Sequence, residues 1–146
     1  MPFVDVKLAD VELEKRTIDL GTYTFQLLPG AEYRRNKFSD VEELNVSAAV
    51  AEGDSSGKRI WFTYPDPTAT SKNGKSFAWS AQALKKLEIA LGTDALPGED
   101  SATYLNRVAS SAAARFKGTV SPSRYIRDGE TDPRPEFNVF SVGPAA

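Results

Sequence analysis

Apolar and polar residues alternate along five segments of the chain, and this period of two predicts five β-strands. In the first segment, Tyr23, Phe25 and Leu27 alternate with polar residues, and Pro29-Gly30 is expected to bend or bulge the strand. The second and third are joined by the turn residues "EGDSSG", which predicts a hairpin. The expected strands are 22–27, 44–50, 58–64, 115–120 and 136–142.

Two segments between the third and fourth strands have a helical pattern instead. In "FAWSAQALKKLEIALG" the apolar residues recur at helical spacing, with Ser80 as the candidate N-cap and Gly92 as the end. A second helix is expected over Asp100–Ala113, where Asp100 can cap the first turn and alanine is frequent near the end.

The order of strand, strand, strand, helix, helix, strand, strand is typical of an OB-fold, a small and partly open five-stranded barrel. This predicts a mainly β protein with helices (α+β). A five-stranded sheet with flanking helices has the same element order and is the alternative. Residues 1–20 are interpreted as an N-terminal extension, 21–142 as the OB-fold domain, and 143–146 as a short tail. The residues expected to point into the core are Tyr23, Phe25, Val46, Phe62, Phe116, Phe137 and Val139.

The composition excludes several kinds of chemistry. The chain of 146 residues contains no cysteine and no histidine, so disulfides, thiolate or imidazole metal sites and histidine-based catalysis are impossible. We therefore expect no enzyme, no metal and no cofactor. The sequence has neither a secretory signal nor a membrane-length apolar run, and a cytoplasmic protein without membrane contact is expected.

Charge is unevenly distributed along the chain. Residues 1–54 have 11 acids and 6 bases, residues 55–127 have 5 acids and 11 bases, and residues 128–146 have 4 acids and 1 base. A basic middle segment is compatible with a solvated surface and also with a nucleic-acid partner.

Basic and aromatic residues also lie on the strand faces that are expected to point outward. Trp61 is the most informative, because its neighbour Phe62 already supplies the buried face of the same strand. Trp61 either packs under the N-terminal extension or a helix, or it is a platform on which a base stacks, whereas Trp79 is expected in the core. The candidate DNA-binding residues are Tyr33, Arg34, Arg35, Lys37, Arg59, Trp61, Lys72, Lys75, Arg115, Lys117, Arg124, Tyr125 and Arg127. Cations that follow phosphates and exposed rings that stack on bases are what a single-stranded nucleic acid requires.

Over residues 20–142 the chain resembles the OB-fold single-stranded DNA-binding proteins of bacteriophages. The matching parts are the segments "GTYTFQLLPGAEYR", "GKRIWFTY", "ALKKLEIALG" and "ARFKGTVSPSRYIRDGETDPRPEFNVFSV". The resemblance implies sequence-tolerant binding of single-stranded DNA in phage replication or recombination, within the cytoplasm of a bacterial host. It places Arg59, Trp61, Arg115 and Lys117 on strands that line the binding groove. The sequence ends "SVGPAA" where the bacterial relatives have an acidic, glycine-rich tail, and recruitment of other replication proteins through such a tail is not expected.

Two other functions remain open. A protein-interaction module, such as a virion or assembly component, would use the same exposed strands for homo-oligomerisation, since aromatic residues and arginine are enriched at interfaces. The partners expected besides single-stranded DNA are a second copy of the chain and phage replication or recombination proteins. A carboxylate-dependent enzyme is the other, although no strand face carries a cluster of acids.

Overall fold

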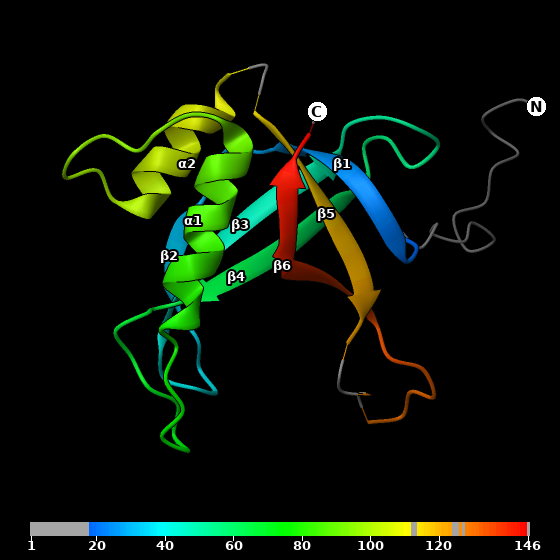
Figure 1. Cartoon of the computed structure of the whole chain (residues 1–146). Helices are drawn as coiled ribbons and strands as arrows, with labels where there is room; N and C mark the ends of the chain where they lie inside the picture. Colours follow the sequence, from blue (N-terminus) through cyan, green and yellow to red (C-terminus); the bar gives the residue numbers. More distant parts are fainter. Residues whose placement is uncertain (1–17, 112–113, 124–125, 127, 146) are drawn as a thin grey trace, which may run out of the picture.

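The computed structural model describes residues 18–111, 114–123, 126 and 128–145. They form an antiparallel sheet of six strands and two helices (Figure 1). The elements are β1 (Gly21–Leu27), β2 (Glu32–Arg35), β3 (Glu42–Val50), β4 (Arg59–Pro65), α1 (Trp79–Leu91), α2 (Ser101–Ala109), β5 (Arg115–Pro122) and β6 (Pro135–Pro144). The predicted mainly β architecture with helices is therefore confirmed.

The sheet is open. Its strands follow the order β2-β3-β1-β5-β6. β1 and β2 pair with different parts of one edge of β3, and β4 pairs with its opposite edge. Within the described residues no backbone pairing joins β4 to β6, so the closure of a barrel is not observed. The two strands instead meet through side chains, because the rings of Phe62 and Phe137 stack with 4.4 Å between their centroids.

The break between β1 and β2 corresponds to the predicted bend at Pro29-Gly30. Gly30 has a φ of 102°, which favours glycine. The side chain of Asn106 in α2 holds this break: its Oδ1 accepts from the backbone N–H groups of Gly30 and Ala31, each at 2.9 Å. Its Nδ2 donates to the carbonyl of Ala31 at 2.9 Å. One asparagine thus satisfies three backbone groups that a regular ladder would have paired.

The core lies between the sheet and α1, and its register is as predicted. Phe25, Val46, Phe62 and Phe116 are buried, and Val139 is partly buried against them. Phe137 is buried and Tyr23 is partly buried, as expected. The core depends on a missing side chain as well, because a Cβ on Gly118 would lie 2.4 Å from the ring of Phe137.

The expectation that Trp79 belongs to this core is wrong. Its side chain is 38% exposed and packs against the ring of Phe140 at a centroid distance of 5.3 Å. The reason is that Trp79 is the first residue of α1, where the helix has only begun to cover the sheet.

The ends of the helices agree with the sequence in part. The N-cap of α1 is Ala78, without a side-chain hydrogen bond, whereas Ser80 lies inside the helix with a buried hydroxyl that has no partner. The predicted cap at Ser80 is therefore wrong. Gly92 ends α1 with a φ of 71°, and Asp100 caps α2 by accepting from the N–H of Thr103 at 2.9 Å, both as predicted.

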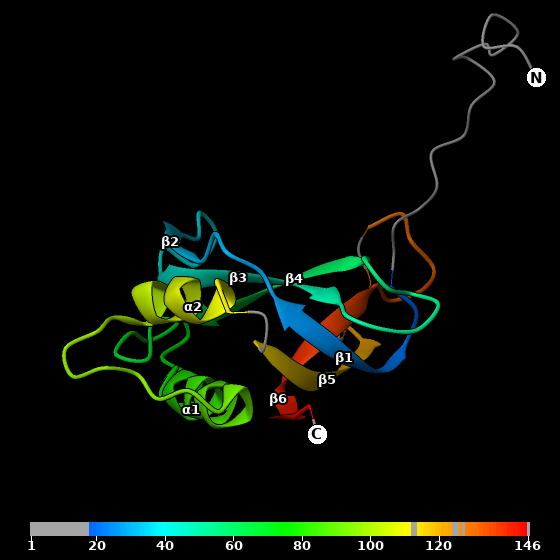
Figure 2. The same cartoon turned by 90° about the horizontal axis from the view of Figure 1, so that it is seen from above.

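The second helix ends earlier than predicted, at Ala109 rather than Ala113. No helix among the described residues has both the length and the apolar character needed to cross a bilayer. Seen from above, α1 and β6 lie on one side of the molecule and β2, β3 and β4 on the other (Figure 2). The outward faces of β3 and β4 are therefore directed away from α1.

Candidate nucleic-acid interface

A row of paired residues crosses four strands and ends in an arginine on each side. Arg59 of β4 pairs with Ala49 of β3, Ala49 pairs with Gln26 of β1, and Gln26 pairs with Arg115 of β5. Directly paired residues of neighbouring strands point to the same face of a sheet. Three strand spacings of about 4.8 Å separate the two arginines, so their backbones are roughly 14 Å apart.

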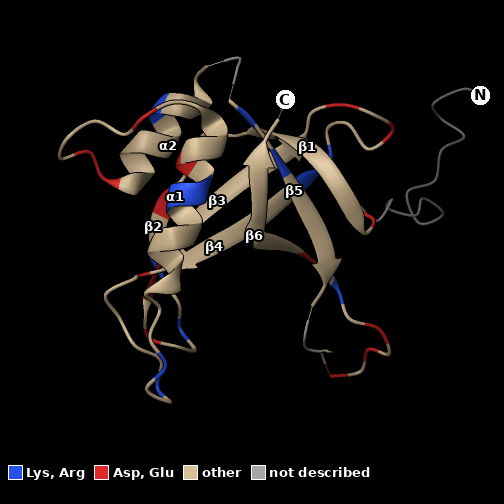
Figure 3. Ribbon diagram, in the orientation of Figure 1, with Lys and Arg blue, Asp and Glu red and all other residues tan. Residues whose placement is uncertain are grey.

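The neighbouring rows contribute Trp61 and Lys117 to the same face. Trp61 pairs with Ser47, and Lys117 pairs with Thr24. We call Arg59, Trp61, Arg115 and Lys117, with the small or polar residues paired to them, the outer sheet face. Figure 3 shows basic residues at the start of β4 and of β5, which are the two strands that carry these cations.

The four residues of the outer sheet face are accessible. Trp61 is 67% exposed, so this residue is not covered by a helix. Among the described residues, no carboxylate forms an ion pair with Arg59, Arg115 or Lys117. Arg115 donates only a long hydrogen bond, of 3.4 Å, to Oε1 of Gln26. These cations are free to bind an anion.

The predicted site residues of β2 are engaged within the protein instead. The hydroxyl of Tyr33 donates to Oδ1 of Asp100 and accepts from the N–H of Ala102, both at 3.3 Å, and so joins β2 to the first turn of α2. Hydrogen bonds from the N–H and hydroxyl of Thr103 lower the pKa of this Asp100.

Both arginines of β2 are paired with carboxylates. Arg34 forms an ion pair with Glu32, and Nη1 of Arg35 lies 3.0 Å from Oδ1 of Asp40 and 2.6 Å from the carbonyl of Asp40. Each carboxylate offsets the charge of its arginine, so a phosphate is attracted less strongly to these guanidinium groups than to one without an acidic partner. The structure therefore assigns Tyr33 and Arg35 to the support of β2 and its turn.

The turn after β2 presents Lys37 and Phe38. Oδ1 of Asn36 accepts from the N–H groups of Phe38 and Ser39 at 2.8 and 3.2 Å, which fixes the turn. Phe38 is 90% exposed, and no ion pair involves Lys37 among the described residues. Arg35 and Asp40 brace the same turn from its two ends.

Lys72 and Lys75 lie in a tight hairpin between β4 and α1. The N–H of Ser71 donates to the carbonyl of Lys75 at 2.8 Å, and Gly74 has a φ of 78°. Both lysines are exposed. The hairpin follows the last residue of β4, whereas Arg59 is the first, and a strand of this length spans about 20 Å. The structure therefore does not bring these lysines together with Arg59.

Three other predicted site residues, Arg124, Tyr125 and Arg127, lie outside the described residues. Of the thirteen candidates, the structure brings Arg59, Trp61, Arg115 and Lys117 together on one face. Arg34 pairs with Glu43 and so lies on the same face at the β2 end of the sheet, where it forms its ion pair with Glu32.

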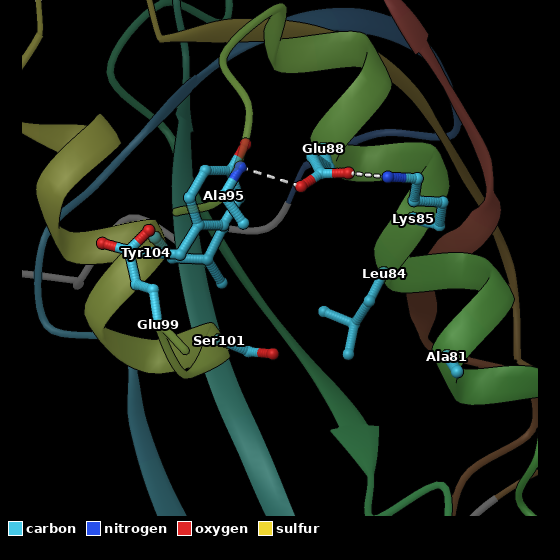
Figure 4. Close-up of a pocket in the computed structure, with 9 residues that line it drawn as sticks. Ala81, Leu84, Lys85, Glu88, Ala95, Glu99, Ser101 and Tyr104 are labelled. Carbon is cyan, nitrogen blue, oxygen red and sulfur yellow. Dashed lines mark hydrogen bonds and ion pairs between the residues drawn. The ribbon is translucent and has the colours of Figure 1, made fainter. Parts of the chain in front are cut away.

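A cavity between α1 and α2 is the clearest alternative location for a site (Figure 4). Its volume is about 230 Å³. Its charged groups are already paired: Glu88 with Lys85 and with the N–H of Ala95 at 2.9 Å, and Glu99 with Arg107 at 2.8 Å. The guanidinium of Arg107 lowers the pKa of Glu99 to about 2. These contacts fasten the loop between the two helices.

The described part of the chain contains no cluster of three or more histidine, cysteine or acidic residues that could hold a metal ion. One surface feature escaped the sequence analysis, namely a group of exposed aromatic rings around Trp79 and Phe140. The signal for it was weak, because Phe140 lies in a segment that alternates like a regular strand.

Comparison with known proteins adds no identification to this geometry. The chain matches no family model, no curated protein and no solved structure. What can be concluded about its function must therefore come from the arrangement of its own residues.

Proposed function

We propose that this chain binds single-stranded DNA, without strong sequence preference, through the outer sheet face. Arg59, Arg115 and Lys117 hold phosphates, and the exposed ring of Trp61 stacks on a base. The protein needs no chemistry of its own for this function, and it fits a role in phage replication or recombination in a bacterial cytoplasm. The proposal rests on the resemblance carried by residues 20–142 and on the geometry of this face.

The observation that carries the proposal is the cross-strand row from Arg59 to Arg115. It places two guanidinium groups, neither of them in an ion pair with a carboxylate of the described residues, at the ends of a strip whose middle positions are Ala49 and Gln26. Neither side chain is bulky or acidic, so an extended polyanion can lie across the strip. Sequence-tolerant binding of single strands combines such a basic track with stacking on aromatic rings.

The OB-fold is part of the same proposal. β1 and β2 act as one strand that is interrupted at Leu28–Ala31. Both parts pair with β3, and β1 also pairs with β5. The helices fall between β4 and β5 in the chain. We propose that the sheet is an OB-type barrel whose last seam, between β4 and β6, is closed by the stacked rings of Phe62 and Phe137 rather than by backbone hydrogen bonds.

The first test is a titration of the protein with oligo-dT at several salt concentrations. Each phosphate neutralised on a single strand contributes about −0.7 to the slope of log affinity against log salt. Three cations on the outer sheet face therefore predict a slope of roughly −2 or steeper. A flat response to salt, or equal affinity for duplex DNA, would contradict the proposal.

The second test concerns the ring of Trp61. Trp61→Ala is expected to weaken binding by about 1–3 kcal/mol, the range for a stack of a base on an aromatic ring. Thr63→Ala is the matched control, because Thr63 lies on the same face of the same strand and is exposed. It should leave the affinity almost unchanged. Equal affinities for the two variants would remove Trp61 from the interface.

Self-association is a second candidate function, favoured by the exposure of Trp61 and of Phe38. An interface between copies would bury such rings. Analytical ultracentrifugation separates the two candidates: a dimer that Trp61→Ala dissociates, together with unchanged oligonucleotide affinity, would assign the ring to a subunit contact.

A further inference from the structure

A second group of exposed aromatic rings lies at the start of α1. The ring of Trp79 packs between those of Phe140 and Phe77, with centroid distances of 5.3 and 6.5 Å. Trp79 is 38% exposed and Phe140 is 50% exposed. The rings contact one another but leave open faces, as a stacking surface requires.

The backbone of β6 presents Phe140 to solvent. Opposite the single residue Gly118, β6 has four residues, Val139–Val142, and the register shifts there. The bulge is held by the hydroxyl of Ser141, which accepts from the N–H of Thr119 at 2.8 Å. It is also held by Asn138, whose Oδ1 accepts from the N–H of Phe140 at 3.0 Å. Bulges of this kind commonly redirect a side chain beside a functional site.

The bulge and Trp79 border an open groove of about 850 Å³, which is also lined by Ser121, Asn138 and Glu136. A cation accompanies the rings: Nζ of Lys86, two helical turns after Trp79, donates to the carbonyl of Phe140 at 3.4 Å. Within the described residues Lys86 has no carboxylate partner. Glu136 is the acidic residue among those that line the groove.

We infer that this groove, which we call the Trp79 groove, is a second contact for the same single-stranded DNA. This inference rests on the proposed function of the outer sheet face. Trp79 and Phe140 stack on bases, and Lys86 holds a phosphate. Trp61 lies on the exposed face of β4, whereas Trp79 begins α1 and packs on Phe140 of β6. A single DNA strand must therefore pass around the edge of the β-sheet to contact both tryptophans. The Trp79 groove consequently binds only oligonucleotides that are long enough to reach it from the outer sheet face.

The test uses the fact that the chain contains two tryptophans. In Trp61→Phe the remaining fluorescence comes from Trp79, and in Trp79→Phe it comes from Trp61. OB-fold sites cover about 4–16 nucleotides, so oligo-dT of about 6 and about 30 nucleotides are the probes. We expect the long probe to quench both reporters, and the short probe to quench Trp61 alone.

Affinity provides the second measurement. Trp79→Ala combined with Phe140→Ala should reduce the affinity for the long probe at least tenfold and leave that for the short probe within twofold. Lys86→Gln should weaken the binding of the long probe, and Glu136→Gln should strengthen it, because it removes a carboxylate that repels phosphates. Circular dichroism confirms that each variant is folded.

The possible failures are distinguishable. If the long probe quenches Trp61 but not Trp79, the groove is not a DNA contact and the proposed function stands. If neither probe binds the wild-type protein at any salt concentration, both proposals fail. If the double variant changes the sedimentation of the protein without changing either affinity, the groove binds protein and the inference is overturned.

Discussion

The outer sheet face and β2 both have arginines close to an aromatic residue, but the arginines of the two regions have different surroundings. On the outer sheet face, Arg59 and Arg115 have no carboxylate partner among the described residues, and Trp61 is exposed. In β2, Arg34 and Arg35 are paired with Glu32 and Asp40. From the sequence alone the two regions look equally basic. They differ in whether the arginines already form an ion pair within the protein.

The difference has a simple local cause. The segment 32–43 contains four acids among its charged residues. Glu32 lies two residues before Arg34 in β2, and the turn between β2 and β3 brings Asp40 to Arg35. Arg59 and Arg115 face Ala49 and Gln26 across their strands instead. The presence or absence of a neighbouring carboxylate therefore determines how readily a surface arginine binds an external phosphate.

The largest effect that we expect separates the two faces of β4. Phe62→Ala should lower the free energy of unfolding by about 3–5 kcal/mol, because it removes a buried ring that stacks on Phe137. Trp61→Ala, at the adjacent exposed position, should change stability little. Urea denaturation of both variants measures the contrast. Comparable losses of stability would show that Trp61 is part of the core, and the comparison with β2 would then no longer hold.

The second prediction compares the two pairs of arginines directly. Arg59→Gln with Arg115→Gln should reduce the magnitude of the salt slope of single-strand binding by about 1.4, which is twice 0.7. Arg34→Gln with Arg35→Gln changes the net charge of the protein equally and is the matched control. It should leave the slope nearly unchanged. The same reduction in both double variants would mean that binding follows overall charge, and that the outer sheet face has no special role.

Five of the six strands and the presence of both helices were predictable from the sequence, because the strands are short and alternate regularly, whereas β2 was not predicted as a strand of its own. Phe25, Val46 and Phe116 are buried as their period-two pattern indicates. The sequence could not show that β4 and β6 remain unpaired, because the pairing of strands distant in the chain is not set by the alternation within each strand. Nor could it show that Asn106 in α2 would hold the break at Gly30, a contact between residues that are 76 positions apart.

The sequence could predict which candidate residues of one strand share a face, but not which strands lie side by side. Arg59 and Trp61 share a face by alternation within one strand, and Arg115 and Lys117 share one in the same way. Whether the two pairs meet depends on the order of the strands in the sheet. Tyr33 was assigned to DNA binding because it neighbours arginines, but its hydroxyl contacts the start of α2.

The third prediction tests that structural assignment of Tyr33. Tyr33→Phe keeps the ring and removes the hydroxyl that joins β2 to Asp100 and Ala102. We expect a loss of about 0.5–1.5 kcal/mol of stability, the usual net value of a hydrogen bond, with unchanged oligonucleotide affinity. Denaturant titration and fluorescence titration measure the two quantities. A variant that is fully stable but binds DNA more weakly would return Tyr33 to the interface.

The smallest effect that we expect appears only in acid and concerns a pair that is fully satisfied, Glu99 and Arg107. The pKa of Glu99 is lowered from 4.5 to about 2 in the folded protein, chiefly by hydrogen bonds from Arg107. A carboxyl group with a lowered pKa stabilises the folded state fully above its ordinary pKa, and this contribution is lost as the pH falls. Stability should therefore decline between about pH 4.5 and pH 2, and Glu99→Gln should make this decline shallower. Thermal unfolding across this range measures it. Since Arg59 forms no ion pair with a carboxylate in the part of the chain that the structure describes, replacing it by glutamine should leave the acid profile unchanged. An altered profile would reveal that Arg59, too, is paired.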